Sequence, residues 1–203
     1  MDRISPNRDM FFLWVDSVGG FWVCLGDEVV LGQAIPSSGA DIPIMGDISK
    51  RHIRVRRDGE GYLAEAIRDI RVDGRPVDQV TLLGDRNLID LGACVQVLFR
   101  RAHPLSATAR LDLISGHRTQ PPSDAVLLMA DTCVLGPKPT SHVVARDWPD
   151  EVVLYRHGDQ LFCRSGGSVE IDGVRHRGGS PITRSSRIVG DGFSMSLEPM
   201  TPP

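Results

Sequence analysis

A succession of short apolar runs without a helical period restricts the fold of this chain more than any other feature. The runs are rich in β-branched and aromatic residues and include FWVCL, EVVLG, HIRVRR, CVQVLF, AVLLMA and EVVLYR. Gly, Asp, Ser or Pro separates them, and 21 Gly and 14 Pro spread along the chain supply turns. Short strands joined by such turns are typical of sandwiches and barrels. We therefore expect an all-β protein of short antiparallel strands.

The sequence also repeats itself. Four landmarks recur in the same order, namely Gly32 as Gly136, Asp47 as Asp147, Asp73 as Asp172 and Gly92 as Gly192. Their separations lie between 99 and 104 residues, and such a constant interval indicates a duplicated structural unit. We therefore expect two tandem antiparallel β-sandwiches, at residues 10–102 and 103–203.

The composition excludes several classes of partner. The 26 acidic and 23 basic residues leave a net charge of -3, so no overall field would draw the chain to nucleic acid. The apolar run near the N-terminus is short and is interrupted by Asp16, whereas a membrane span needs roughly 20 apolar residues. We expect a cytoplasmic protein without membrane insertion.

No catalytic, metal or cofactor motif is present in the sequence. G-x-S-x-G, H-E-x-x-H and a complete phosphate-binding loop are all missing, and the six histidines are scattered. Four cysteines lie far apart in apolar stretches, where we expect small buried thiols: Cys24, Cys94, Cys133 and Cys163. We therefore expect no enzymatic activity, no metal and no cofactor.

The first half resembles the forkhead-associated (FHA) domain family. The likeness covers about Phe12 to Arg101 and runs through VVLGQ, ISKRHIRV, RVDGRPV and LLGDRNLIDLGACVQVLF. Its most specific element is Ser49-x-x-His52, which begins 17 residues after Gly32. The resemblance implies an eleven-stranded FHA/SMAD-like β-sandwich that recognises phosphothreonine peptides from loops at one end. It also implies structural roles in the loops for four residues, namely Gly32, His52, Asp73 and Gly74.

The residues at the family's ligand positions are altered. Gln33 stands where the family has a phosphate-binding Arg, and Arg68 stands where it has the Asn that holds the peptide backbone. Ser49 is retained, and its neighbour Lys50 lies at a position that also reaches the phosphate in the family. A neutral donor binds phosphate more weakly than a charged one, so Gln33 should weaken the site. Alternatively, Lys50, Arg51 and Arg68 form a rebuilt anion site around Ser49.

The second half departs further from the family pattern. Pro137 replaces the Arg of the first loop, and the alignment of the two halves places Pro149 and Val152 at the positions of Ser49 and His52. No phosphate donor remains there, so we expect a degenerate copy with a structural or partner-contact role. Trp148 could contact a partner or cover the edge of its own core.

Two functions remain open from the sequence. The first is a scaffold or signalling adaptor that binds proteins without phosphate, or self-associates through an exposed strand edge or apolar patch. The second is a phosphothreonine-peptide reader that uses Gln33, Ser49, Lys50, Arg51 and Arg68 of the first half.

Overall fold

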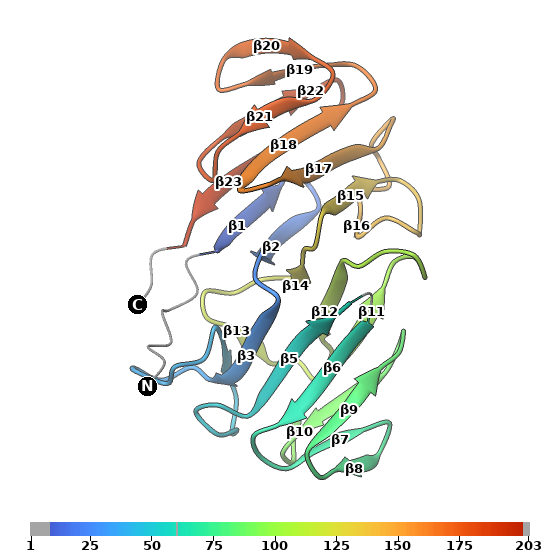
Figure 1. Cartoon of the computed structure of the whole chain (residues 1–203). Coiled ribbons are helices and arrows are strands. Elements are labelled where there is room, and N and C mark those ends of the chain that lie inside the picture. Colours follow the sequence, from blue (N-terminus) through green and yellow to red (C-terminus); the bar gives the residue numbers. More distant parts are fainter. Residues whose placement is uncertain (1–8, 60, 201–203) are drawn as a thin grey trace.

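The computed structural model describes residues 9–59 and 61–200, and these residues form strands and no helix (Figure 1). The strands belong to three sheets of twelve, six and five strands. The all-β prediction is therefore confirmed.

The two larger sheets bring together strands from distant parts of the chain, whereas the five-stranded sheet is built from residues 132–182. In spatial order, the large sheet consists of β20 (Val174–Arg177), β19 (Ser168–Ile171), β22 (Arg187–Gly190), β23 (Phe193–Pro199), β1 (Met10–Val15), β2 (Gly19–Cys24), β14 (Ala125–Leu128), β12 (Ala109–Leu113), β11 (Val95–Arg101), β10 (Leu88–Leu91), β7 (Ile70–Val72) and β8 (Arg75–Val77). The six-stranded sheet consists of β13 (Arg118–Thr119), β4 (Ile42–Met45), β3 (Glu28–Gln33), β5 (Ile53–Asp58), β6 (Gly61–Ala66) and β9 (Val80–Leu83). The five-stranded sheet consists of β16 (Val143–Val144), β15 (Thr132–Gly136), β17 (Val152–His157), β18 (Gln160–Ser165) and β21 (Ser180–Ile182).

Most neighbouring strands are antiparallel, as expected, but three pairs are parallel. These are β2 with β14, β3 with β4, and β15 with β16. A parallel pair needs a connection that brings the chain back to its starting end. Residues 34–41 make this return between β3 and β4, so this connection is not a hairpin.

Two hydrophobic cores lie on the two sides of the large sheet. The first core fills the space to the six-stranded sheet and contains Tyr62 and Phe99. The second core fills the space to the five-stranded sheet and contains Leu154 and Leu197. The six-stranded sheet occupies the lower half of Figure 1 and the five-stranded sheet the upper half.

The strands β1, β2 and β14 bury side chains on both of their faces. One face enters the first core with Phe12, Trp22 and Leu128, and the opposite face enters the second core with Phe11, Phe21 and Leu127. A strand buried on both faces has a continuous apolar run instead of alternation. This is why MFFLWV and AVLL lack the polar residues that alternate through HIRVRR.

The first strand of each predicted half pairs with the last strand of the other half. In the register of β1 and β23, Leu13 lies opposite Leu197, and in the register of β12 and β11, Leu111 lies opposite Phe99. Between these pairs, β2 and β14 lie side by side and join the halves. The boundary between residues 102 and 103 stays a prediction, and both cores draw strands from both sides of it.

Corresponding turns in the two halves have the same geometry. Asp73 and Asp172 adopt positive φ angles of 50° and 52°, and each precedes a glycine with positive φ. Each aspartate carboxylate accepts an amide hydrogen bond of 2.8 Å, from Leu88 and from Arg187 respectively. Two consecutive residues with positive φ are typical of tight hairpin turns. These parallels support the tandem repeat, which stays a prediction.

The strand pairing shows that part of the sequence alignment between the two halves is displaced by one residue. Ile53 pairs with Ala66 in β5 and β6, and Val152 pairs with Ser165 in β17 and β18. Val152 therefore corresponds to Ile53 and not to His52. The alignment was wrong at this position because it matched loop residues across connections of unequal length.

Trp148 belongs to the second core. Its side chain is 6% exposed, and its ring centroid lies 4.9 Å from that of Phe193. Of the two roles considered for this residue, the structure supports the covering of its own core.

Three of the four cysteines are buried, as expected, and Cys94 is exposed. Burial raises the pKa of the Cys133 and Cys163 thiols to about 12. Cys94 differs because it lies in the turn between β10 and β11, before the apolar run of β11 begins. The prediction of a buried thiol was therefore wrong at Cys94.

Candidate binding loops of the first half

Gly32 allows β3 to pass directly against the loop that carries Ser49. A Cβ atom at Gly32 would lie 1.9 Å from the carbonyl oxygen of Lys50. Glycine in a strand interior often marks such a close backbone approach. At the next position, the Gln33 amide donates to the carbonyl oxygen of Ser49 at 3.0 Å. The loop of residues 46–52 is therefore fixed against the end of β3.

His52 connects this loop to the neighbouring loop of residues 67–69. Its Nδ1 atom accepts a hydrogen bond from the Ser49 amide at 3.1 Å, so the ring proton lies on Nε2, which donates to the Asp69 carbonyl oxygen at 3.0 Å. The His52 carbonyl oxygen also accepts from the amides of Ile67 and Arg68. The side chain is 4% exposed. His52 thus links two loops without presenting its ring to solvent.

Ser49 and Lys50 place two polar side-chain groups in this loop. Ser49 is half-buried and Lys50 is exposed. Within residues 9–59 and 61–200, neither the Ser49 hydroxyl nor the Lys50 ammonium has a hydrogen-bond or ion-pair partner. The loop therefore combines a fixed backbone with two polar side chains that have no partner among the described residues.

Arg51 lies against the connection between β3 and β4. Its Cδ atom lies 3.6 Å from the position of a Cβ on Gly39, and its Nε atom is buried without a hydrogen-bond partner in the described part of the chain. Burial raises the pKa of the nearby Asp41 carboxyl, while the positive charges of Arg51 and Arg54 lower it. Arg51 thus contributes to the charge balance around a half-buried carboxyl group.

The two altered ligand positions are engaged with backbone carbonyls. The side-chain amide of Gln33 donates to the Gly46 carbonyl oxygen at 3.3 Å, and a guanidinium nitrogen of Arg68 donates to the Ile67 carbonyl oxygen at 2.9 Å. Arg68 and Arg51 are thus directed to different neighbours. A ligand would have to displace these contacts before Gln33 or Arg68 could bind it through the same groups.

Asp73 and Gly74 lie in the turn between β7 and β8 and hold a different connection. The Asp73 carboxylate accepts from the side-chain amide of Asn87 at 2.6 Å and from the Leu88 amide at 2.8 Å. These contacts fix the approach to β10. Asp73 and Gly74 therefore lie beside the start of β10, and the contacts of Asp73 are made there and not with the loop of Ser49.

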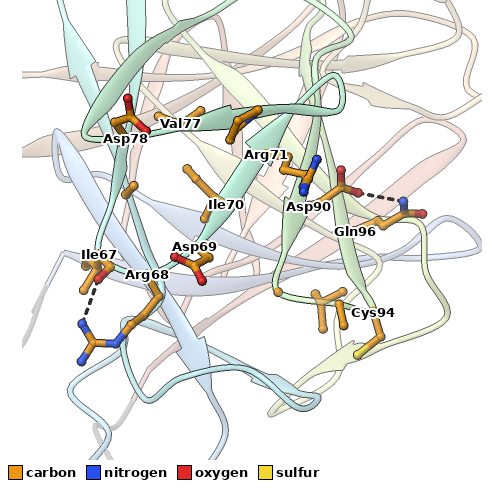
Figure 2. Close-up of a pocket in the computed structure, with 15 residues that line it drawn as sticks. Ile67, Arg68, Asp69, Ile70, Arg71, Val77, Asp78, Asp90, Cys94 and Gln96 are labelled. Atoms are coloured by element: carbon orange, nitrogen blue, oxygen red, sulfur yellow. Dashed lines mark hydrogen bonds between the residues drawn. The ribbon is translucent and has the colours of Figure 1, made fainter.

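An open groove of about 1190 Å³ begins beside Arg68 (Figure 2). Its walls come from residues 66–71 on one side and 92–96 on the other, with residues 76–78 of β8 and the turn after it. Its charged lining residues are two arginines and three aspartates, namely Arg68, Arg71, Asp69, Asp78 and Asp90. Figure 2 shows Arg68 directed to Ile67, away from the side formed by Cys94 and Gln96. The groove therefore has no excess of positive charge to attract phosphate.

Residues of the second half support the same loops, a role that no sequence motif indicated. β13 pairs with β4, and a Cβ atom on Gly46 would lie 3.0 Å from the His117 ring. The Ser115 hydroxyl oxygen accepts from the Gln96 amide at 3.0 Å and is 2.8 Å from Nδ1 of His117. β4 and β13 are about 70 residues apart in the chain, a separation at which local motifs carry no information.

Two further classes of feature are missing from the described ranges. Residues 9–59 and 61–200 contain no helix long and apolar enough to cross a membrane. In the same ranges, no group of three or more His, Cys, Asp and Glu side chains is placed to hold a metal ion.

Known proteins resemble this chain over part of its length. No protein-family model matches the sequence, and no curated protein matches it. The FHA domain of CT664 protein from Chlamydia trachomatis is 21% identical over 41% of this chain and 89% of that chain, with a TM-score of 0.32. The Rv0020c FHA structure is 24% identical over 41% and 84%, with a TM-score of 0.27. An FHA domain from work on phosphothreonine-dependent interactions is 26% identical over 41% and 88%, with a TM-score of 0.26. The family therefore stays a resemblance.

Proposed function

We propose that this chain is a non-enzymatic protein-interaction module, a scaffold or adaptor, whose first half contacts a partner through the loop of Ser49 and Lys50. The observation that carries the proposal is the contrast within this loop. Gly32 and His52 fix its backbone, whereas the Ser49 hydroxyl and the Lys50 ammonium have no partner among the described residues. A preordered loop loses little entropy when it binds, so its free polar groups are available for recognition.

Phosphate-independent binding is the favoured mode. Gln33 carries no charge, and its side-chain amide already donates to Gly46. A hydrogen bond to a charged group contributes about 1.5 to 3 kcal/mol, so the missing Arg corresponds to roughly a ten- to hundredfold loss of affinity for phosphate. The acidic residues of the adjacent groove add no compensation. The site therefore suits a polar or acidic protein surface better than a phosphate group.

A phosphothreonine reader is the second candidate, and the cations around Ser49 favour it. Lys50 is exposed next to Ser49, and the Nε atom of Arg51 is buried without a hydrogen-bond partner in the described residues. Rotation of these two side chains toward Ser49 would supply the charge that Gln33 lacks. This candidate differs from the first in a measurable way, because its binding depends on phosphate.

Binding of the full chain to matched phosphothreonine and threonine peptide libraries distinguishes the two candidates. The chain has two lysines, Lys50 and Lys138, so Lys138→Ala is a control for Lys50→Ala. The favoured proposal predicts equal binding to both libraries, weakened by Lys50→Ala and unchanged by Lys138→Ala. The second candidate predicts binding that is lost on dephosphorylation and in Ser49→Ala. If neither library binds, or if Lys50→Ala has no effect, the loop is not the contact surface.

A further inference from the structure

The six edge strands of the three sheets differ in how they are protected against pairing with another chain. An unpaired edge is a template for further strands, and proteins block it with short strands, proline or charge. β13 and β16 have two residues each, β8 and β21 contain Pro76 and Pro181, and β20 contains two arginines and a histidine. β9, with the sequence VTLL, has none of these protections.

The outward side chains of β9 are apolar and exposed. Val80 is 53% exposed and Leu82 is 68% exposed. Within the sheet, Leu82 lies opposite the half-buried Leu63 of β6. Val80, Leu82 and Leu63 therefore form an apolar strip on the outer face of the six-stranded sheet, at its β9 edge.

The backbone groups of the same two residues point away from the sheet. The Ala66 amide donates to the Gln79 carbonyl oxygen at 2.7 Å, and hydrogen-bonded pairs alternate along an antiparallel ladder. Thr81 and Leu83 therefore bond to β6, while the N–H and C=O groups of Val80 and Leu82 face outward. No hydrogen bond to these outward groups occurs within residues 9–59 and 61–200.

The second half shows the same edge in a blocked form. Leu83 pairs with Tyr62, and Ile182 pairs with Leu161, so Leu82 corresponds to Pro181. Proline has no N–H group and is accepted in a sheet only where that group would face solvent. Pro181 therefore lacks the outward N–H group in β21, whereas Leu82 offers this group at the corresponding position of β9.

We propose that β9 pairs with β9 of a second copy of this chain, in an antiparallel register that places Val80 opposite Leu82. This inference rests on the proposed function, because it names one partner of the interaction module. In this register both outward residues of each copy exchange backbone hydrogen bonds. Val80 and Leu82 of the two copies then form apolar cross-strand pairs on one face.

The charges around β9 are compatible with a second copy. Val80–Leu83 contains no ionisable residue. In the proposed register Asp78 lies opposite Gly84 of the second copy, and Asp85 lies opposite Val77, so no two carboxylates face each other. The paired edge is only four residues long and is much smaller than the roughly 1,200 to 2,000 Å² of stable complexes. We therefore expect a weak dimer that forms at high protein concentration.

Sedimentation equilibrium of the full chain at increasing concentration tests this pairing. Leu82→Pro removes an outward N–H group and no bond to β6, as Pro181 does in the second half. We expect this variant to unfold like the wild type and to dimerise at least about tenfold more weakly, because each dimer loses two hydrogen bonds.

Leu82→Lys should have the same effect, whereas Val174→Lys, which changes an exposed aliphatic residue on the edge strand β20, should leave dimerisation unchanged. A monomer at all concentrations would overturn this inference, and so would equal dimerisation of wild type and Leu82→Pro. Peptide binding at the loop of Ser49 is measured separately, so failure of one proposal does not imply failure of the other.

Discussion

The shared strand β1 predicts that the two cores unfold together. Phe11 is fully buried in the second core, and its neighbour Phe12 is 3% exposed in the first core. Replacing a buried Phe by Ala costs about 3 to 5 kcal/mol. Native proteins typically have a total stability of about 5 to 15 kcal/mol, so a variant of a chain in the middle of this range should still fold. The corresponding fall in Tm is about 6 to 20 °C at roughly 2 to 4 °C per kcal/mol.

Buried thiols report the unfolding of each core separately. Cys24 lies in the first core and Cys163 in the second, and the exposed Cys94 can be replaced by Ser. Labelling of each thiol at increasing urea concentration, read by mass spectrometry, should give one midpoint for both cysteines in the wild type. Phe11→Ala and Phe12→Ala should each lower both midpoints by the same amount.

The control for these variants is Leu105→Ala, which changes a residue that is 84% exposed and should leave both midpoints unchanged. If Phe12→Ala shifts only the midpoint of Cys24, the cores are independent and the shared strand does not couple them.

Three further predictions concern single residues. Gly32→Ala places a methyl group against the Lys50 carbonyl and should lower the unfolding free energy by about 2 kcal/mol or more, whereas Gly167→Ala, at an open position, should change it little in the same urea titration. His52→Ala leaves the Ser49 amide unpaired and should cost about 2 to 4 kcal/mol, with faster hydrogen exchange at that amide than in the wild type. Burial lowers the pKa of His142 from 6.5 to about 4. As the pH falls, the imidazole is therefore protonated in the unfolded chain before it is protonated in the folded chain. The unfolding free energy should fall by up to about 3 kcal/mol between pH 6.5 and pH 4. Chemical unfolding at about pH 7 and about pH 4.5 should show this loss in the wild type and not in His142→Asn.

The class of the fold was predictable from the sequence, but the exchange of first strands was not. Alternation and turn residues identified the strands because both are local properties. The continuous run MFFLWV indicates a strand buried on two faces, but a local pattern does not say which strands lie beside it. The pairing of β1 with β23 joins residues at opposite ends of the chain. Only the three-dimensional arrangement determines such a contact.

For the candidate site, the sequence indicated which backbone segments lie together and not how their side chains are directed. Gly32 near the end of β3 and His52 both lie against the loop of Ser49, as the resemblance to the FHA family implied. The direction of each side chain was not predictable, since the contact of Gln33 with Gly46 and the proximity of Arg51 to Asp41 depend on rotamers and on residues from other loops.

Residues of the second half contribute to the packing of the first half. β13 extends the six-stranded sheet beside β4, and His117 packs on Gly46, whose carbonyl oxygen holds Gln33. Removal of the second half would expose one face of β1 and β2 and would withdraw this support from the loop of Ser49. The connection between β12 and β14 is therefore tied to β4 and Gly46 of the first half. This support follows from the sheet that the two halves share.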